Sequence, residues 1–370
     1  MLKLSRYLVG ILFIISGLIK LNDPIGFSIK LEEYFVIFGM DWLGAYALSL
    51  SVIICAVEVV LGIALLLGIM QKQLAWVLLF MIIFFTWLTG YSAVTNKVTD
   101  CGCFGDAIKL TPWQSFSKDL VLMFFIAIIF VYRNKINSTL SSVKQIIYVL
   151  SAYVITISIG IYSVMYLPTV DFLPYKIGNN IPELMKIPDG APKDSFETKM
   201  IYAKDGKEQA FTLKDYPWQD STWKWVRTDN ILIKEGYHPK IKDLRISDAD
   251  GNDYSEDIIN HPDYSLWVVS YDLEKVNTGA YVKINEVAAL LEKNLKIRSI
   301  GLTSSNDIST ENFRHEQNVS FPFYYCDATT LKTMVRANPG ILLIHNGVVE
   351  GKWSFRSFPT YENLIKQLKN

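Results

Sequence analysis

Two cysteines separated by a single glycine are the residues of this chain best spaced to act as one chemical unit. They occur in the segment Asp100-Cys101-Gly102-Cys103-Phe104-Gly105. Because glycine lets the backbone bend until two alpha carbons come within bridging range, Cys101 and Cys103 can close a small, strained disulfide. A strained disulfide is readily reduced, which suits thiol–disulfide exchange. We therefore take Cys101 and Cys103 as the candidate catalytic residues.

The same two cysteines are compatible with other roles. A permanent disulfide, a pair of thiols that only shapes a turn, and a metal-binding pair all stay open, because two glycines and a phenylalanine suit a tight loop in every case. Two thiolates do not fill a zinc shell, however, and no histidine lies nearby in the sequence. The four histidines of the chain are scattered: His238, His261, His315 and His345. We expect no metal site.

The elements that must position these cysteines are membrane helices. Lys, Arg, Asp and Glu number 72 in the chain of 370 residues, and only 19 of them fall in residues 1–167. This part contains five apolar runs, at 8–19, 42–70, 74–94, 116–132 and 146–167. With flanking residues, each is near or above the ~20 residues that a helix needs to cross ~30 Å of hydrocarbon. We predict five transmembrane helices in a lipid bilayer, followed by a soluble part.

Basic residues give the orientation of the predicted spans. They fall at alternate ends of the spans: Lys3, Arg6, Lys72, Arg133, Lys135 and Lys144. Because cytoplasmic loops are enriched in Lys and Arg, the amino terminus is predicted to be cytoplasmic. Cys101, Cys103 and everything beyond Pro168 then lie on the periplasmic side of a bacterial inner membrane, where disulfides form. The net charge of zero and the lack of a long basic block exclude nucleic acid as a partner.

Polar residues inside the spans are functional candidates because they are costly there. Glu58 is taken as the one acid deep in a span, and Lys20, at the outer end of the first span, is its nearest basic candidate, although that position favours a side chain too far out to reach. A protonated Glu58 bonded to a neighbouring helix stays open as the alternative. The segment 24–40 mixes apolar and charged residues, and we expect an amphipathic helix along the outer interface.

The membrane part resembles a known family in two motifs. The residues Phe13-Ile14-Ile15-Ser16-Gly17-Leu18-Ile19-Lys20, with Pro24, Tyr34, Glu58-x-x-x-Gly62 and Gly68, look like the DoxX family of small bacterial four-helix membrane proteins. The segment from Asp100 to Gly105 is similar to the MauE branch, which is linked to disulfide formation in methylamine dehydrogenase and grouped with vitamin K epoxide reductase-like bundles. The resemblance implies a redox-linked four-helix bundle over residues 4–132, with Cys101 and Cys103 matching the family pair.

A quinone is the cofactor considered for such a bundle, since the pair at the membrane edge would face both a lipid-soluble carrier and a soluble thiol partner. Aromatic residues near the predicted outer interface are candidates to line its pocket: Trp87, Tyr91, Phe104 and Trp113. Aromatic residues are enriched at that depth in any membrane protein, so this assignment carries little weight alone. The chain also lacks the Cys-x-x-Cys of vitamin K epoxide reductases and adds a fifth span and a large outer domain.

The soluble part opens with a linker and a hairpin and ends in alternating strands and helices. The turn Lys204-Asp205-Gly206-Lys207 predicts the hairpin, and we expect Trp218, Trp223 and Trp225 to pack in a buried aromatic cluster. From 241 onward we expect a hairpin around 248–251, strands at 266–271, 297–303, 321–325, 341–345 and 348–353, and helices near 282–294, 310–317, 329–337 and 361–368. This order predicts an α/β sandwich.

The end of the chain resembles the second half of a thioredoxin or peroxiredoxin domain. The resemblance rests on this order and on the run from Arg336 to Gly347, and it implies that Pro339 is the family's cis-proline beside the active cysteines. The loop at 272–277 holds no cysteine, so we expect this domain to be redox-inactive by itself. Cys326 is a candidate relay or partner thiol that would form a mixed disulfide with Cys101 or Cys103; a buried, idle thiol is the alternative.

These observations divide the chain into four regions. Residues 1–135 form a DoxX/MauE-like four-helix membrane domain, 136–170 the fifth span and anchor, 171–240 a β-rich linker region, and 241–370 a thioredoxin-like extracytoplasmic domain. One function is thiol–disulfide exchange or electron transfer to envelope proteins. Another is a non-catalytic scaffold of an envelope complex that uses a degenerate thioredoxin-like domain for docking. A transporter is disfavoured because the five spans show no repeat.

Overall fold

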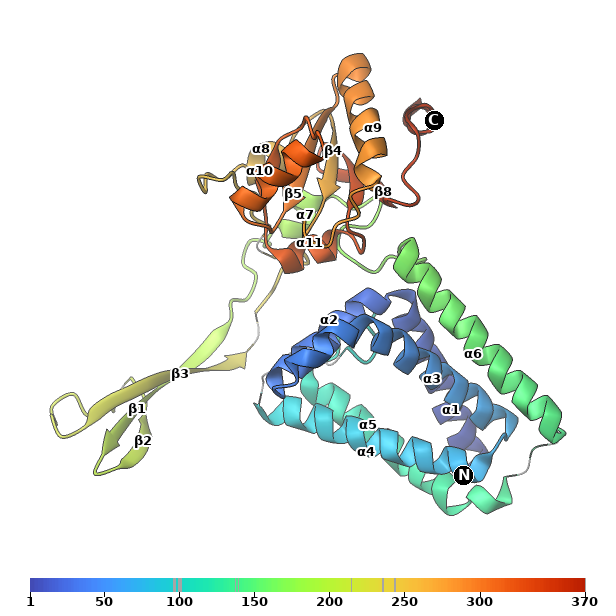
Figure 1. Cartoon of the computed structure of the whole chain (residues 1–370). Coiled ribbons are helices and arrows are strands. Elements are labelled where there is room, and N and C mark those ends of the chain that lie inside the picture. Colours follow the sequence, from blue (N-terminus) through green and yellow to red (C-terminus); the bar gives the residue numbers. More distant parts are fainter. Residues whose placement is uncertain are drawn as a thin grey trace. The chain divides into compact units, whose positions relative to one another are not determined.

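The chain folds into two compact units. The computed structural model describes residues 1–95, 98, 102–136, 138, 140–213, 215–234, 236–242 and 244–369 (Figure 1). The first unit joins Met1–Asn179 to Arg245–Asn370, and the second is Asn180–Leu244. The first unit therefore holds both the membrane helices and the C-terminal α/β domain.

Among the described residues of the first unit, five helices are long and apolar enough to cross a membrane. They are α1 (Leu2–Asn22), α3 (Ala47–Leu67), α4 (Gln71–Thr95), α5 (Pro112–Val131) and α6 (Ser142–Met165). Shorter helical segments connect them: α2 (Pro24–Ile37), η1 (Asp41–Tyr46) and η2 (Arg133–Lys135). The five predicted spans are thus confirmed as helices. The segment expected to be an amphipathic helix is helical as α2, and its position along a membrane interface stays a prediction.

Side-chain caps fix the starts of α2 and of α5, the helix that follows the cysteine loop. Helix α2 begins with Pro24 in its first turn, and the Asp23 carboxylate caps it by accepting the Gly26 N–H at 2.9 Å. Helix α5 begins with a capping box, in which Thr111 and Gln114 exchange side-chain and backbone hydrogen bonds. The loop that carries Cys103 therefore ends at a well-defined helix start.

Helices α1 and α3 approach each other closely because glycines lie at their contact. A Cβ atom on Gly62 would lie 2.6 Å from the Gly10 carbonyl oxygen, and one on Gly17 would lie 2.6 Å from Val59 Cγ2 and 2.9 Å from the Cys55 carbonyl oxygen. Small residues at such contacts let helix backbones pack in membranes, where burial of apolar surface supplies no driving force between helices. This close packing sets α1 and α3 side by side.

The other spans complete the bundle around this pair. Helix α5 lies alongside α4 and also contacts α1, and α6 packs on α1 and α3. Apolar side chains fill the space between α1, α3, α4 and α5: Val9, Leu65, Leu78, Ile82, Ile126 and Ile129. The four helices α1, α3, α4 and α5 thus share one core, to which α6 is added.

The C-terminal domain of the first unit is a five-stranded sheet with helices. Its strands are β4 (Tyr264–Val269), β5 (Arg298–Thr303), β6 (Phe323–Tyr325), β7 (Gly340–His345) and β8 (Val348–Ser354). Its helices are α8 (Ser255–Ile259), α9 (Ala280–Leu295), α10 (Asp307–Glu316), α11 (Ala328–Met334) and α12 (Tyr361–Lys369). The sheet order is β6-β5-β4-β7-β8, with β4, β5 and β6 parallel and β7 antiparallel to both of its neighbours.

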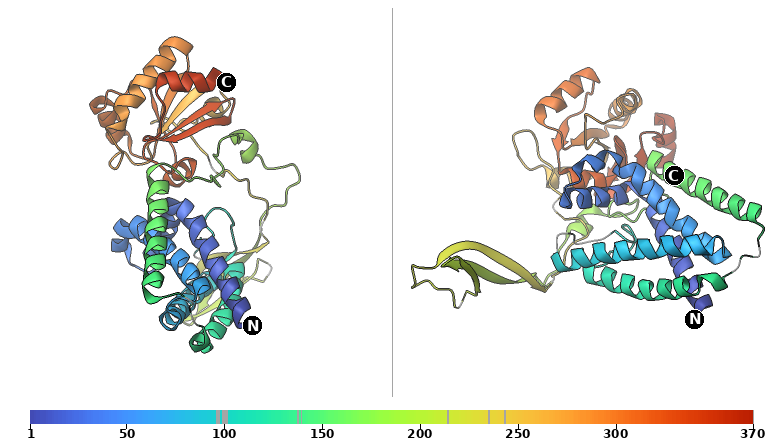
Figure 2. Two further views of the ribbon diagram at one scale, coloured as in Figure 1. Left: turned by 90° about the vertical axis from the view of Figure 1, so that its right-hand side faces the viewer. Right: turned by 60° about the horizontal axis from the view of Figure 1, so that its bottom comes forward.

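This strand order is thioredoxin-like, as the sequence predicted. Helix α9 joins the parallel strands β4 and β5, and the turn at Asn346-Gly347, with φ of 47° and 76°, closes the β7–β8 hairpin. The orange and red strands form one sheet in the left view of Figure 2. Leu266 faces Leu343 across β4 and β7, and both belong to the core beneath α9. The Asn338–Pro339 peptide bond is cis, which is the geometry that the resemblance implied.

One local prediction for this domain is confirmed as a minimal hairpin, and two predicted boundaries are wrong. At 248–251 the chain reverses in a tight turn, with an antiparallel bridge between Ser247 and Asp253 and an Asp248 side chain that accepts the Asn252 N–H at 2.9 Å. The strand expected from 321 begins at Phe323. The helix expected to reach 337 ends at Met334, since Val335 is extended.

The second unit is an antiparallel sheet with one short helix. Its elements are α7 (Ile181–Met185), β1 (Ser195–Lys204), β2 (Lys207–Phe211) and β3 (Lys224–Lys234), in the sheet order β2-β1-β3. The predicted hairpin is confirmed by the β1–β2 pairing. The predicted aromatic cluster is wrong: Trp218 and Trp225 are exposed, and Trp223 packs on Phe211 with ring centroids 5.0 Å apart. A three-stranded sheet has too little surface to cover three tryptophans.

Replacement of Gly62 by alanine is expected to destabilise the bundle by about 1–3 kcal/mol, because the added methyl overpacks the contact with Gly10. Gly44→Ala is the matched control, since a Cβ atom there meets nothing within 4 Å. Thermal unfolding of the purified protein in detergent measures both changes. Equal shifts in the two variants would show that the α1–α3 contact does not need glycine.

Candidate functional site

A cavity of about 440 Å³ lies inside the helical bundle. Its wall is mostly apolar and includes side chains from α1, α2, α3, α4 and α5. The polar or reactive groups in the wall include Ser16, Lys20, Glu58, Thr89, Cys103, Lys118 and Asp119. A mostly apolar cavity with a few convergent polar groups is the usual form of a small-molecule site. The cavity is therefore the candidate site of the membrane part.

The Lys20–Glu58 ion pair crosses from α1 to α3 in this wall. Lys20 Nζ lies 2.5 Å from Glu58 Oε2, with side chains 4% and 8% exposed, and the ammonium also lies 5.1 Å from the centre of the Phe27 ring. The expectation that Lys20 lies too far out to reach is wrong. Gly17, one turn before Lys20, brings α1 against α3 next to Glu58 and so shortens the distance between them.

A hydroxyl group links this ion pair to the cysteine loop. Ser16 Oγ lies 3.0 Å from the Cys103 carbonyl oxygen and 3.5 Å from Glu58 Oε2. Cys103 is half-buried and lines the cavity. Gly102 has a φ of +66°, a left-handed conformation that favours glycine, so its expected role as the bend before Cys103 agrees with the backbone. Cys101 lies outside the described residues, and the geometry of the pair stays a prediction.

A second charged cluster stands in the same wall, and sequence reasoning missed it. Asp119 is 2% exposed; its Oδ1 lies 2.9 Å from Lys118 Nζ, and its Oδ2 accepts the Thr89 hydroxyl at 2.9 Å. The statement that Glu58 is the one acid deep in a span is therefore wrong. The signal was available, since Asp119 falls inside the apolar run 116–132 and an acid there is costly without a partner.

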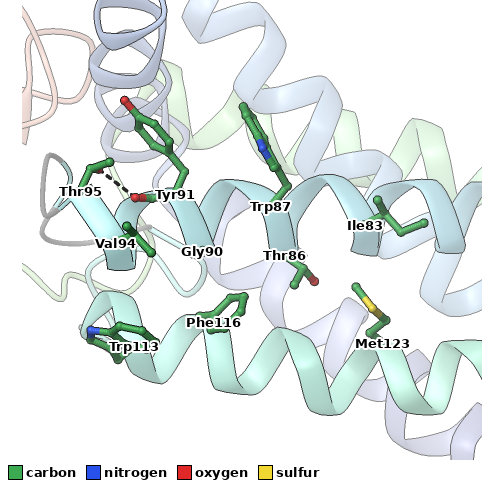
Figure 3. A pocket seen from close by; sticks show the side chains of 10 residues that line it. All are labelled: Ile83, Thr86, Trp87, Gly90, Tyr91, Val94, Thr95, Trp113, Phe116 and Met123. Carbon is green, nitrogen blue, oxygen red and sulfur yellow. Dashed lines mark hydrogen bonds between the residues drawn. The ribbon is translucent and has the colours of Figure 1, made fainter.

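The aromatic residues proposed for a quinone pocket do not share one cavity. Trp87, Tyr91 and Trp113 line a separate groove of about 460 Å³ between α4 and α5 (Figure 3). There the Phe116 ring packs against Gly90, where a Cβ atom would lie 3.1 Å from it. Phe104 instead lines the bundle cavity beside Cys103. Phe104 is thus the member of that set that shares a cavity with a cysteine.

The thiol of Cys326 is poorly placed for exchange. Cys326 is 8% exposed, and its backbone N–H donates to the Thr303 carbonyl oxygen at 2.9 Å. Burial raises the pKa of this thiol to about 12, so little thiolate is present at neutral pH. These features favour the buried, idle thiol over the relay, which stays a prediction.

The cis-proline corner is hydrogen-bonded to the loop between Asp272 and Asn277. Asn338 Nδ2 donates to the Asp272 carbonyl oxygen at 2.7 Å, and the Asn277 N–H donates to the Asn338 carbonyl oxygen at 3.2 Å. The loop between Asp272 and Asn277 contains no thiol. Pro339 thus stands beside this loop, and its role in any exchange stays a prediction.

Two family models match separate parts of the chain. Residues 1–132 match the family model "Methylamine utilisation protein MauE". Residues 196–235, within the second unit, match a model described as a domain of unknown function. We refer to residues 1–132 as the MauE-like segment; it contains α1 to α5, the bundle cavity and the cysteine loop.

Individual relatives cover only part of the chain. Protein TlpB of Flavobacterium psychrophilum is 28% identical over 135 residues, which are 36% of this chain and 37% of that protein. The chain therefore matches little more than a third of this relative's length. Two solved structures overlap with 34% of the chain: yeast Sco1 (10% identity, 95% of that chain, TM-score 0.28) and a mutant of Xylella fastidiosa PrxQ (14%, 86%, 0.24).

Removal of one member of the Lys20–Glu58 pair is expected to cost about 3–5 kcal/mol of stability, because it leaves the other charge buried and uncompensated. Glu58→Gln and Lys20→Met test this, and the double variant is expected to unfold closer to the native temperature than either single variant. Lys30→Met is the control: Lys30 pairs with Glu33 at 3.1 Å in a more exposed place, so its loss is expected to cost at most about 1 kcal/mol. Equal effects of all single changes would contradict a buried pair.

Cys326 is expected to react slowly with iodoacetamide in the native protein at pH 8 and quickly after unfolding. The reason is the raised pKa, which keeps the thiol protonated well above neutral pH, so its rate should keep rising with pH toward about 12. Peptide-resolved mass spectrometry measures the rate, with the same peptide in the unfolded protein as reference. A native rate that levels off near pH 8–9, the usual thiol range, would show an accessible and activated cysteine.

Proposed function

We propose that this membrane protein is a thiol–disulfide oxidoreductase of the bacterial inner membrane. Cys101 and Cys103 would form the exchange-active pair, with proteins of the cell envelope as thiol partners on the periplasmic side. The observation that carries the proposal is that Cys103 lines an apolar cavity inside the MauE-like segment, next to buried charged groups. A thiol there has access to a reactant held within the bundle.

The cavity suits a quinone ring as that reactant. Its volume of about 440 Å³ and its largely apolar wall match a flat apolar ring, while the Lys20 ammonium supplies N–H donors for a carbonyl oxygen. A bound quinone would take up the two electrons and two protons that a dithiol releases when it becomes a disulfide. The chain itself would supply the thiols, the hydrogen-bond donors and the proton acceptor.

The polar residues of the wall support thiol chemistry. The Lys20 ammonium places a positive charge in the same cavity wall as Cys103, and a nearby positive charge favours a thiolate. The Ser16 hydroxyl lies within reach of both the Cys103 carbonyl oxygen and the Glu58 carboxylate, so it helps to fix the loop relative to the ion pair. The Glu58 carboxylate, whose Oε2 lies 3.5 Å from this hydroxyl, is the base that would accept a proton in the proposed site.

The periplasmic location rests on the distribution of basic residues. Lys72 lies at the start of α4, and Arg133 and Lys135 follow α5, which are the helix ends opposite the cysteine loop. Because basic residues mark the cytoplasmic side, Cys103 and the thioredoxin-like domain belong on the other side. That side is the compartment in which disulfides persist.

A scaffold function is the second candidate. Its support is that the thioredoxin-like domain has no cysteine in the loop between Asp272 and Asn277, and that the Cys326 thiol is buried with a raised pKa. Such a domain would bind a partner of an envelope complex without exchanging electrons. The two functions differ in what they require of Cys101 and Cys103.

The Cys101→Ser, Cys103→Ser double variant is expected to abolish disulfide transfer to envelope proteins while leaving the amount of folded protein unchanged. Acid trapping and alkylation in intact cells reads the redox state of the native pair. The pair should become more reduced when respiration is inhibited, because a reduced quinone pool can no longer take up its electrons. Cys55→Ser is the matched control, because Cys55 is fully buried in α3. The scaffold function would be favoured by two results together. The double variant would retain full cellular function, and the redox state of the native pair would not change when respiration is inhibited.

A further inference from the structure

A buried arginine connects the thioredoxin-like domain to the cysteine loop within the first unit. Arg336 Nε donates to Asp23 Oδ2 and its Nη2 donates to Asp106 Oδ2, both at 2.9 Å. Its Nη1 donates to the Lys332 carbonyl oxygen at 2.7 Å. The Arg336 side chain is 5% exposed. All three guanidinium nitrogens therefore have an acceptor, and two carboxylates share one positive charge.

The positions of the two carboxylates make this contact relevant to Cys103. Asp106 lies three residues after Cys103 on the same loop, and Asp23 caps the start of α2. Arg336 itself lies three residues before the cis-proline Pro339. One side chain thus holds the cysteine loop, the corner between α1 and α2, and the proline corner of the thioredoxin-like domain.

The surroundings of the arginine are shaped to admit it. A Cβ atom on Gly26 would lie 2.5 Å from Asp23 Oδ2 and 2.9 Å from Arg336 Nη2, so no larger residue fits there without a shift. Asp23, Gly26 and Asp106 also line one small cavity together with Gly102 and Gly105 of the cysteine loop. The carboxylates and the loop backbone therefore face a common, tightly filled space.

We propose that Arg336 is a positioning residue for Cys103, an inference that rests on the proposed function for its chemical meaning. The planar guanidinium binds two carboxylates at fixed angles, which a lysine ammonium does not do. Its removal leaves Asp23 and Asp106 as two negative charges with no shared partner, and the loop loses its anchor. The thioredoxin-like domain would then help to position Cys103 through this contact, a role that requires no thiol in the domain.

The test measures how fast Cys103 is alkylated in the purified, reduced full-length protein in detergent. Rates from peptide-resolved mass spectrometry are followed against pH, because the plateau rate reports access to the sulfur and the midpoint reports the pKa of the thiol. Arg336→Ala is expected to raise the plateau rate about tenfold, since loss of one member of a buried charge group frees the others. Arg314→Ala, which removes a pair with Glu311 on α10, is the control and should change nothing.

A double-mutant comparison separates positioning from general loosening. Asp106→Asn should raise the plateau rate as Arg336→Ala does, and the two changes together should do no more than the larger of them, because both break one contact. Arg336→Lys should restore part of the native rate, and Gly26→Ala should act in the direction of Arg336→Ala. If Arg336→Ala fails to fold, Asp106→Asn, whose side chain is 29% exposed, provides the test.

A plateau rate in Arg336→Ala or Asp106→Asn within about twofold of the native value, or additive effects in the double variant, would overturn the inference. This outcome is distinguishable from failure of the proposed function. The alkylation rate is measured on reduced protein without any electron acceptor, whereas the proposed function is tested by the redox state of the pair in cells. If the variants are alkylated faster but the native pair shows no redox change in cells, Arg336 still positions Cys103. Only the proposed oxidoreductase function would then be lost.

Discussion

The buried ion pair between Lys20 and Glu58 is the interaction on which the membrane site depends. Each charge alone would be costly inside a span, and together they offset that cost only if the two helices come close enough for direct contact. Gly10, Gly17 and Gly62 supply the close approach of α1 and α3. The charged wall of the cavity therefore follows from the packing of small residues.

The described part of the cysteine loop is held from two directions. Ser16 binds the Cys103 carbonyl oxygen from α1, and Arg336 binds Asp106 from the thioredoxin-like domain. Gly102 provides the left-handed turn between the two cysteines. These contacts hold the Cys103 backbone at one place in the cavity wall, and such positioning is what transfer to a bound reactant would require.

The sequence predicted what local patterns determine and missed what distant contacts determine. The five spans and the succession of strands and helices in the thioredoxin-like domain were recoverable, because apolar runs and turn residues act within a few positions. Cys103 was placed near the membrane bundle by its motif. The partnership of Arg336 with Asp23, across 313 residues, has no local signal. Whether Lys20 contacts Glu58 depends on the distance between α1 and α3, which cannot be predicted from either helix alone.

The Lys20–Glu58 pair also constrains how the protein is made. Helix α1 precedes α3 in the chain, so Lys20 is synthesised before its partner Glu58. A lysine without its carboxylate is costly inside the bilayer. Stable burial of the outer end of α1 therefore requires that α3 is also in place.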